Sequence, residues 1–327
     1  IVRAALRAAA PQNRPSVRSP STVSSGRSDR SGEPRPALSR RRPAAGGTEP
    51  DGAPRASSEQ RALGRSNAAA PLRIIVSAIE HESILETACD LERDGVEVVR
   101  LPVDRDGVVD LATLRRALDR QTVLVSVMYV SNELGTVEPI GEVSRTIREW
   151  RVARGTPYPY LHTDAAQALA YLDLDVRRLG VDLMTLSAHK AYGPKGIGVL
   201  YRREGVVLEP PTTGGGQEFG LRSGTENVAS VVGFARAVEV AAACREREAV
   251  RAARLRNLFV ARVRRVAPSL AVNGGGHRAP HIVNVRFPGR RADDLAVALD
   301  IAGVAVSAGA ACAARAAKPS HVLKAIG

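Results

Sequence analysis

The stretch "TLSAHKAYGPKGIGVLY", residues 185–201, combines a strand signal, a lysine and closely spaced glycines. It continues the apolar run "LMTLSA" (183–188), which has the length and composition of a buried strand. Lys190 follows this run, and Gly193, Gly196 and Gly198 follow Lys190 within eight residues. Glycines let a backbone turn back sharply or approach a ligand closely. The stretch therefore predicts a lysine at the end of a strand, on a turn built of small residues.

Similar short runs of apolar and β-branched residues recur along the chain and alternate with helical patterns. The other predicted strands are 73–79, 96–103, 122–130, 160–165 and 198–203, and the predicted helices are 82–93, 110–118, 140–154 and 176–179. Strands that alternate with helices form a mostly parallel sheet that helices cover on both faces. The sequence thus predicts a large α/β domain over residues 72–250.

A smaller α+β domain is predicted over residues 251–327. One long helical pattern runs from residue 227 to about residue 266, and strands at 279–287 and 303–309 flank a helix at 293–299.

Composition narrows the class of protein. Residues 1–71 hold no Phe, Tyr, Trp, Met or Lys and nine of the 20 prolines, so they cannot bury enough apolar surface to offset the entropy of ordering them. We expect this Arg/Pro/Ser-rich segment to be a disordered, low-complexity domain of its own. The net charge is +13, but no aromatic residues interleave the basic ones and no groove-reading motif is present, so nucleic acid is not a predicted partner.

The sequence gives no sign of a membrane or a secreted protein. No apolar run approaches the ~20 residues that a membrane span needs. Three cysteines are too few and too scattered for a disulfide scaffold or a zinc site, so no metal is predicted. This cysteine usage favours a reducing, cytoplasmic location.

Several polar residues follow predicted strands, where ligands of open α/β sheets bind. Lys190 has the character of a lysine that forms a Schiff base, as in enzymes that use pyridoxal phosphate (PLP), although most lysines are simply exposed. Asp164, in "LHTDAAQA", could keep a pyridine nitrogen protonated, and Gln167 could reach the ring oxygen. The alternative for Asp164 is a helix N-cap. Ser187 and His189 could donate hydrogen bonds to a phosphate.

Two further strand ends carry candidates. His81, in "SAIEHES", could stack on a cofactor ring and move protons, or could be an ordinary capping histidine. Asn132, in "VSNELG", is a candidate for substrate binding with a turn residue as its alternative. The Gly-rich stretch "TTGGGQEFGLRSGTEN" (212–227) precedes a helix and suits either a phosphate or a flexible linker.

The cysteines fall into two groups. Cys312 lies in "VSAGAACAARAAKPSHVL", a run of small residues with no helix or strand pattern, where we expect an exposed nucleophile. Cys89 and Cys244 lie within helical patterns and are expected to pack as small apolar side chains.

Together these stretches resemble the cysteine desulfurases, which are class V, fold-type-I PLP enzymes. The resemblance runs from about Arg73 to Gly327 and follows the order of the family. It rests on "SAIEHESILET", "SVMYVSNELGTVEPI", "HTDAAQA", "LSAHKAYGPKGIGVLY", "GGGQEFGLRSGTEN" and "SAGAACAARAAKPSHVL". The cysteine loop and the following Pro-Ser-His-Val-Leu resemble the branch that serves iron–sulfur cluster assembly and tRNA thiolation.

The resemblance implies a role for each candidate. It implies the fold-type-I architecture, with a three-layer, mostly parallel sheet and a small C-terminal domain, and removal of sulfur from L-cysteine to give L-alanine. Cys312 would receive the sulfur as a persulfide and pass it to an acceptor protein, either an iron–sulfur scaffold or a tRNA-thiolation enzyme. Lys190 would form the Schiff base and transfer the Cα proton, Asp164 would pair with the pyridine nitrogen, and Gln167 would bind the ring oxygen. His81 would stack on the ring, and Asn132 would position the substrate. Ser187 and His189 would bind the phosphate, together with Thr225 reaching in from the partner of a homodimer.

The chain departs from the family at both ends. A Gly-Ala-Thr-Glu loop that holds the phosphate in the family is not found in residues 1–72, and the family's substrate-carboxylate arginine lies beyond Gly327. The first residues faintly resemble a transit peptide, but the chain opens on Ile rather than Met. We therefore expect a fragment with two incomplete domains and an unrelated N-terminal stretch. A non-catalytic relative or a selenocysteine lyase of the same fold are the alternatives.

Overall fold

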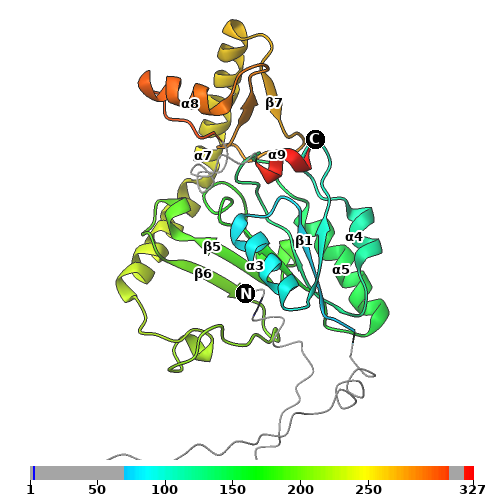
Figure 1. Cartoon of the computed structure of the whole chain (residues 1–327). Coiled ribbons are helices and arrows are strands. Elements are labelled where there is room, and N and C mark those ends of the chain that lie inside the picture. Colours follow the sequence, from blue (N-terminus) through cyan, green and yellow to red (C-terminus); the bar gives the residue numbers. More distant parts are fainter. Residues whose placement is uncertain (1–2, 4–69, 309–319) are drawn as a thin grey trace, which may run out of the picture. The chain divides into compact units, whose positions relative to one another are not determined.

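The structure is a computed structural model that describes Arg3, residues 70–308 and residues 320–327. The segment expected to be disordered and the loop with Cys312 therefore lie almost entirely outside the described residues. Six strands form one sheet in the order β2-β1-β3-β4-β5-β6 (Figure 1). They are β1 (Arg73–Ser77), β2 (Glu97–Leu101), β3 (Thr122–Ser126), β4 (Tyr160–Asp164), β5 (Leu183–Ser187) and β6 (Gly198–Arg202).

The first five strands pair in parallel, and β6 runs antiparallel to β5. Parallel neighbours require a crossover, and helices α3 (Glu82–Arg93), α4 (Leu111–Ala117), α5 (Ile140–Arg154) and α6 (Val176–Leu179) lie in the crossovers. The α/β class and the mostly parallel sheet expected from the sequence are thereby confirmed.

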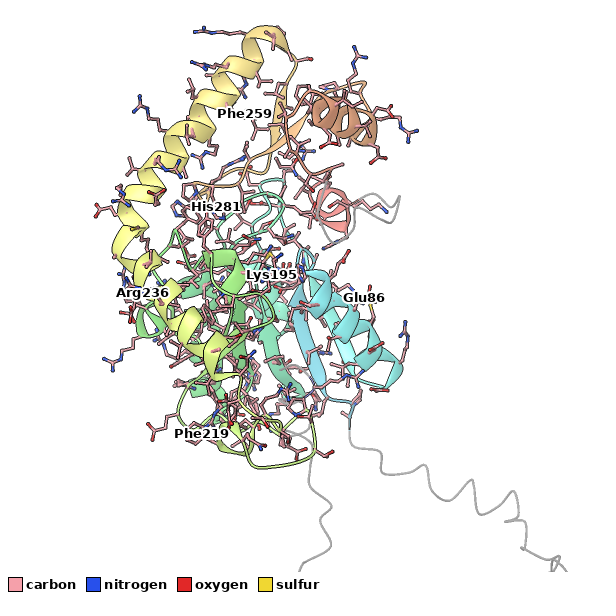
Figure 2. The ribbon with its side chains drawn as sticks, turned by 90° about the vertical axis from the view of Figure 1, so that its left-hand side faces the viewer. Glu86, Lys195, Phe219, Arg236, Phe259 and His281 are labelled. Atoms are coloured by element: carbon pink, nitrogen blue, oxygen red, sulfur yellow. The ribbon has the colours of Figure 1, made fainter. Side chains whose placement is uncertain are left out.

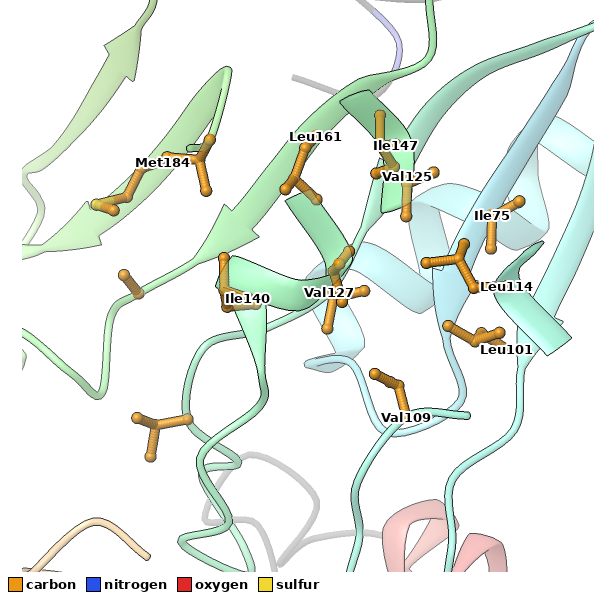
Figure 3. Close-up of a cluster of buried hydrophobic side chains, with 14 of the residues drawn as sticks. Ile75, Leu101, Val109, Leu114, Val125, Val127, Ile140, Ile147, Leu161 and Met184 are labelled. Atoms are coloured by element: carbon orange, nitrogen blue, oxygen red, sulfur yellow. The ribbon is translucent and has the colours of Figure 1, made fainter. Parts of the chain in front are cut away.

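Successive side chains of each strand point to opposite faces of the sheet. Ile74 and Val76 pack in a cluster with Ala88 and Leu91 of α3, whereas Ile75 packs in the cluster of α4 and α5. Figure 3 shows this second cluster, in which Leu114 of α4 and Ile147 of α5 meet strand residues. The sheet is thus the middle layer of three, and a fully buried side chain of this kind stabilises the fold by roughly 1.5–3 kcal/mol.

The helix boundaries follow local capping chemistry. His81, Asp110 and Asp175 each accept a hydrogen bond from a backbone N–H of the first turn of α3, α4 and α6. Gly155 and Gly180 end α5 and α6 in the left-handed conformation, which glycine adopts without a steric penalty. These signals explain why the predicted bounds of α3, α5 and α6 agree with the structure.

The C-terminal part begins with the 39-residue helix α7 (Val228–Val266), which is continuous across residue 250. It continues with the hairpin β7 (Ala271–Asn273) and β8 (Asn284–Arg286), then α8 (Ala292–Ile301) and α9 (His321–Ala325). Two 3-10 turns, η1 (Ala188–Ala191) and η2 (Glu218–Gly220), complete the elements of the described residues.

One expectation for the C-terminal part is wrong. The strand expected at 303–309 is not formed in its described part, residues 303–308, where Val304 and Val306 are about half exposed. A strand requires a hydrogen-bonded neighbour, and β8 pairs with the unpredicted strand β7 instead. The apolar pattern of 303–309 could not reveal which segment would pair.

Among the described helices, none is long and apolar enough to cross a membrane.

Candidate active site

The candidate residues gather where the strand order reverses. The chain passes from β1 outward to β2 and then back to β3, so that the carboxyl ends of β1 and β3 flank a switch point of the sheet. Crevices at such points are where open α/β sheets bind ligands. His81 follows β1, Asn132 follows β3, and Asp164 and Ser187 end β4 and β5.

Lys190 lies on the turn η1, which follows β5 directly. Ala188 and Ala191 of this turn are buried, whereas Lys190 is exposed. The turn is fixed by hydrogen bonds from the N–H of Gly193 to the carbonyl of Ala188 (2.9 Å) and from the N–H of Ala188 to the carbonyl of Ile197 (3.1 Å). The lysine is therefore free to reach a ligand while the backbone beneath it is held.

Two of the glycines after Lys190 stand where a side chain would come too close to neighbouring atoms. A Cβ on Gly198 would lie 2.7 Å from the carbonyl oxygen of Leu186 in the paired strand β5. A Cβ on Gly193 would lie 3.1 Å from Cβ of Ala188 and 3.2 Å from Cβ of Ala237 in α7. These glycines allow the return strand and α7 to approach the lysine turn closely, which a larger residue would prevent.

Asp164 is the last residue of β4 and lies in register with Thr185 of β5. Its carboxylate accepts a hydrogen bond from the N–H of Ala166 (2.9 Å). Burial raises the pKa of Asp164, while the Ala166 N–H and the nearby His81 and Lys190 side chains oppose that rise. The three candidates Asp164, His81 and Lys190 are thus close enough to interact electrostatically.

His81 caps α3 and is held by that role. Its Nδ1 accepts a hydrogen bond from the backbone N–H of Ser83 (3.2 Å) and lies 2.9 Å from Oγ of the same serine. A ring nitrogen that accepts from a backbone N–H carries no proton, so the neutral ring has its proton on Nε2. The capping alternative and the functional interpretation of His81 are therefore compatible, because capping leaves Nε2 to serve the site.

The remaining candidates differ in their contacts and in how exposed they are. Oγ of Ser187 lies 2.9 Å from Nδ1 of His189, so these two form a polar pair beside Lys190. Asn132 and Gln167 are half-buried in the turns that follow β3 and β4. Thr225 is exposed in the segment before α7, and its expected role in the site of a partner subunit stays a prediction. Cys312 lies outside the described residues.

Three buried carboxyl groups near the site were not predicted. Glu80 precedes His81 and is fully buried, Glu133 follows Asn132, and Glu138 lies in the same loop. Glu138 accepts a hydrogen bond from the N–H of Val109 (3.0 Å), and burial raises its pKa to about 8. In the sequence they lie beside strand-end candidates, and this position was a signal of a role near the site. An acidic residue in a polar loop is normally exposed, however, so the sequence could not indicate that these residues are buried.

The other two cysteines are only partly buried, so their expected packing as small apolar side chains stays a prediction. Cys89 in α3 and Cys244 in α7 are free thiols and are half-buried.

The fold and the site define an α/β protein with a lysine, an aspartate and a histidine at the carboxyl ends of parallel strands. The chain belongs to the class-V aminotransferase family, whose sequence signature matches residues 61–327. Members of this family and the related cysteine desulfurases are PLP-dependent enzymes.

Individual relatives point to one branch of the family. The chain is 42% identical to "Cysteine desulfurase IscS" of Dictyoglomus turgidum over 254 residues, which cover 77% of this chain and 63% of the relative. It is 41% identical to "Cysteine desulfurase IscS 1" of Archaeoglobus fulgidus, of which it covers 66%. The chain thus spans about two thirds or less of the length of these relatives.

Solved structures of similar fold also match this chain. A structure described as "NIFS-LIKE PROTEIN" superposes with a TM-score of 0.70 at 34% identity, covering 81% of this chain and 67% of that one. A structure described as "SspA in complex with cysteine" gives a TM-score of 0.64 at 33% identity, covering 79% and 70%.

The residues of the described site fit PLP. The cofactor needs an amine for its aldehyde, a carboxylate for its ring nitrogen and donors for its phosphate. Lys190, the half-buried Asp164 and the Ser187–His189 pair supply these three chemistries at one edge of the sheet. The glycines that follow Lys190 keep bulk away from the same turn.

Proposed function

We propose that the chain is the PLP-binding part of a cysteine desulfurase, which removes sulfur from L-cysteine and leaves L-alanine. The observation that carries the proposal is the placement of His81, Asp164 and Lys190 after β1, β4 and β5, at the same carboxyl edge of the parallel sheet. The similarity to cysteine desulfurases at about 42% identity supports it.

Each residue acts through its own chemistry. Lys190 would hold the cofactor at its aldehyde, and its amine is the group that would move the proton at the substrate Cα. Asp164 would hold a proton on the ring nitrogen, which would keep the ring electron-withdrawing. PLP supplies an electron sink for the bonds at Cα of the substrate.

The other assigned residues orient and bind. His81 would hold the cofactor ring by stacking, Gln167 would donate to the ring oxygen and Asn132 would position the substrate. Ser187 and His189 would bind the phosphate, joined by Thr225 of a partner subunit in a homodimer.

Cys312 is the proposed nucleophile. Its thiolate attacks the sulfur of the bound cysteine, the Cβ–S bond breaks, and the substrate leaves as alanine after protonation. The enzyme keeps a persulfide on Cys312, and the atoms of one cysteine and one thiol balance one alanine and one persulfide. The persulfide sulfur then passes to an acceptor protein of iron–sulfur cluster assembly or tRNA thiolation.

A spectroscopic and a chemical experiment test this function. Adding PLP to the purified chain should produce the visible absorption band of a protein-bound Schiff base, and L-cysteine with a reductant should then yield alanine and sulfide in equal amounts. Lys190→Ala should abolish the band and Cys312→Ala should abolish turnover. Lys195→Ala is the matched control, because Lys195 is an exposed lysine on the same loop (Figure 2). A wild-type chain with no band, or a Cys312→Ala variant with unchanged turnover, contradicts the proposal.

A further inference from the structure

Glu80 joins three parts of the structure at the edge of the candidate site. Its carboxyl Oε1 accepts a hydrogen bond of 2.5 Å from the backbone N–H of Met128, which follows β3. Its backbone carbonyl accepts a hydrogen bond of 2.9 Å from Nε2 of His321, the first residue of α9. Glu80 directly precedes His81, so one residue ties the turn that carries His81 to β3 and to α9.

The environment of Glu80 favours an uncharged carboxylic acid. The residue is 0% exposed, and its Oε2 has no hydrogen-bond partner within residues 70–308 and 320–327. An ionised carboxylate in such a place would lose its hydration without a cation to replace it. Burial raises the pKa of Glu80 well above its usual range, and the nearby carboxyl groups of Asp164 and Glu138 raise it further, against the opposing effect of the Met128 N–H.

Glu80 and Asp164 form a pair in which one group ionises more easily than the other. Asp164 has the N–H of Ala166 and the nearby His81 and Lys190 side chains to stabilise its anion. Glu80 has a single backbone N–H on its carboxyl group. Two interacting carboxyl groups share the first negative charge according to such differences, so the anion belongs on Asp164 and the proton on Glu80.

We propose that Glu80 is a positioning residue of the PLP site and that it acts as an uncharged acid, holding the His81 turn against the segment after β3 and against α9. The role of His81 in this inference rests on the proposed function, whereas the charge state of Glu80 does not. An uncharged Glu80 leaves Asp164 as the anion of the pair, which is the arrangement that a protonated ring nitrogen requires.

The charge state is tested without cofactor by Glu80→Gln in the full chain. Glutamine keeps the acceptor for Met128 and stays uncharged at every pH. A carboxyl whose pKa is higher in the folded than in the unfolded chain contributes stability below its usual pKa of 4.5, and that stability is lost as the pH rises toward the folded value. Glu80→Gln does not lose stability in this way as the pH rises. Its urea midpoint should therefore exceed that of the wild type at pH 8, and the difference between the two midpoints should shrink at pH 5.

A control and a contrary result complete this test. Glu86→Gln changes an exposed carboxyl on α3 (Figure 2) and should leave the urea midpoint equal to that of the wild type at both pH values. A midpoint of Glu80→Gln at or below the wild-type value at pH 8 would show that Glu80 is ionised, and would overturn the inference. The titrating groups that surround Glu80, namely Asp164, Glu138, His81 and His321, are unchanged in both variants.

The positioning role is tested by Glu80→Ala with PLP. Alanine removes the acceptor for Met128, so His81 loses its support, and the dissociation constant of PLP should rise roughly tenfold or more. The visible circular dichroism of the bound cofactor should change as well, and Glu80→Gln should restore both. Equal affinity and dichroism in Glu80→Ala, or failure of Glu80→Gln to restore them, would contradict the role. A wild-type chain that binds no PLP would instead contradict the proposed function, while the unfolding experiment still judges Glu80.

Discussion

Ser320 donates a hydrogen bond of 2.6 Å to the carboxyl group of Glu133, although 187 residues separate them in the sequence. The same hydroxyl oxygen accepts a hydrogen bond of 3.1 Å from the N–H of Leu323 and so caps α9. The backbone carbonyl of Glu133 in turn accepts a hydrogen bond from Asn284 of β8 (3.3 Å). Ser320 therefore fastens α9, which follows the stretch containing Cys312, to the loop that carries Asn132.

Replacing Ser320 with alanine should loosen α9. The variant loses an N-cap worth about 1 kcal/mol and a hydrogen bond to a buried carboxyl group of comparable value. Amide hydrogen exchange at Leu323 and Ile326 should become faster. Lys324→Ala, an exposed change on the same helix, is the control. Unchanged exchange in Ser320→Ala would show that the contact with Glu133 does not stabilise α9.

Replacing Glu138 with glutamine should change how stability depends on pH. The pKa of Glu138 is raised to about 8 by burial, so its stabilising contribution is complete below 4.5 and is lost as the pH rises to about 8. The variant should exceed the wild type in free energy of unfolding at pH 8 by an amount on the order of a few kcal/mol, and by much less at pH 5. Urea unfolding at both pH values measures this, with Glu142→Gln on the exposed face of α5 as the control. Parallel pH profiles of variant and wild type would contradict the expectation.

Replacing Asp182 with alanine should destabilise the sheet strongly. Asp182 is 1% exposed, forms ion pairs with Arg151 and with Arg203 (2.6 Å), and accepts a hydrogen bond from the N–H of Leu161 (2.7 Å). Breaking a buried pair from one side costs about 3–5 kcal/mol, because the partner is left uncompensated.

The matched control for Asp182 is Asp173→Ala. Asp173 forms an exposed ion pair with Arg178, and such pairs are worth about 0–1 kcal/mol. Urea unfolding of both variants separates the two cases. Equal losses of stability would show that burial does not decide the strength of the Asp182 cluster.

Replacing Gly198 with alanine should disturb the lysine turn. The new Cβ would lie 2.7 Å from the carbonyl oxygen of Leu186, so β5 and β6 must move apart at a cost of roughly 1–3 kcal/mol. Weaker PLP binding should accompany the loss of stability, because Ser187 pairs with Gly198 and leads into η1. Gly216→Ala, where a Cβ would meet nothing within 4 Å, should be neutral in both measurements. A Gly198→Ala variant with wild-type stability would contradict this steric argument.

Much of the large domain could be predicted because its signals are local. The strand ahead of Lys190 is an apolar run of the right length, and α5 ends where Gly155 adopts a left-handed conformation. Parallel topology followed from the alternation of strands and helices, and it placed His81, Asp164 and Lys190 at one edge of the sheet. The hairpin of β7 and β8 was not predictable in the same way, because three-residue strands carry almost no periodicity.

The sequence by itself determined the order of most elements, the family and the residues proposed to carry the chemistry, since each depends on residue types within a few positions of one another. The tertiary structure alone decided that Glu80, Glu133 and Glu138 are buried and that Ser320 and His321 bind next to the site. These facts depend on contacts between residues 29 to 241 positions apart. Burial, hydrogen bonding and the resulting pKa values arise only when the chain brings such distant groups together.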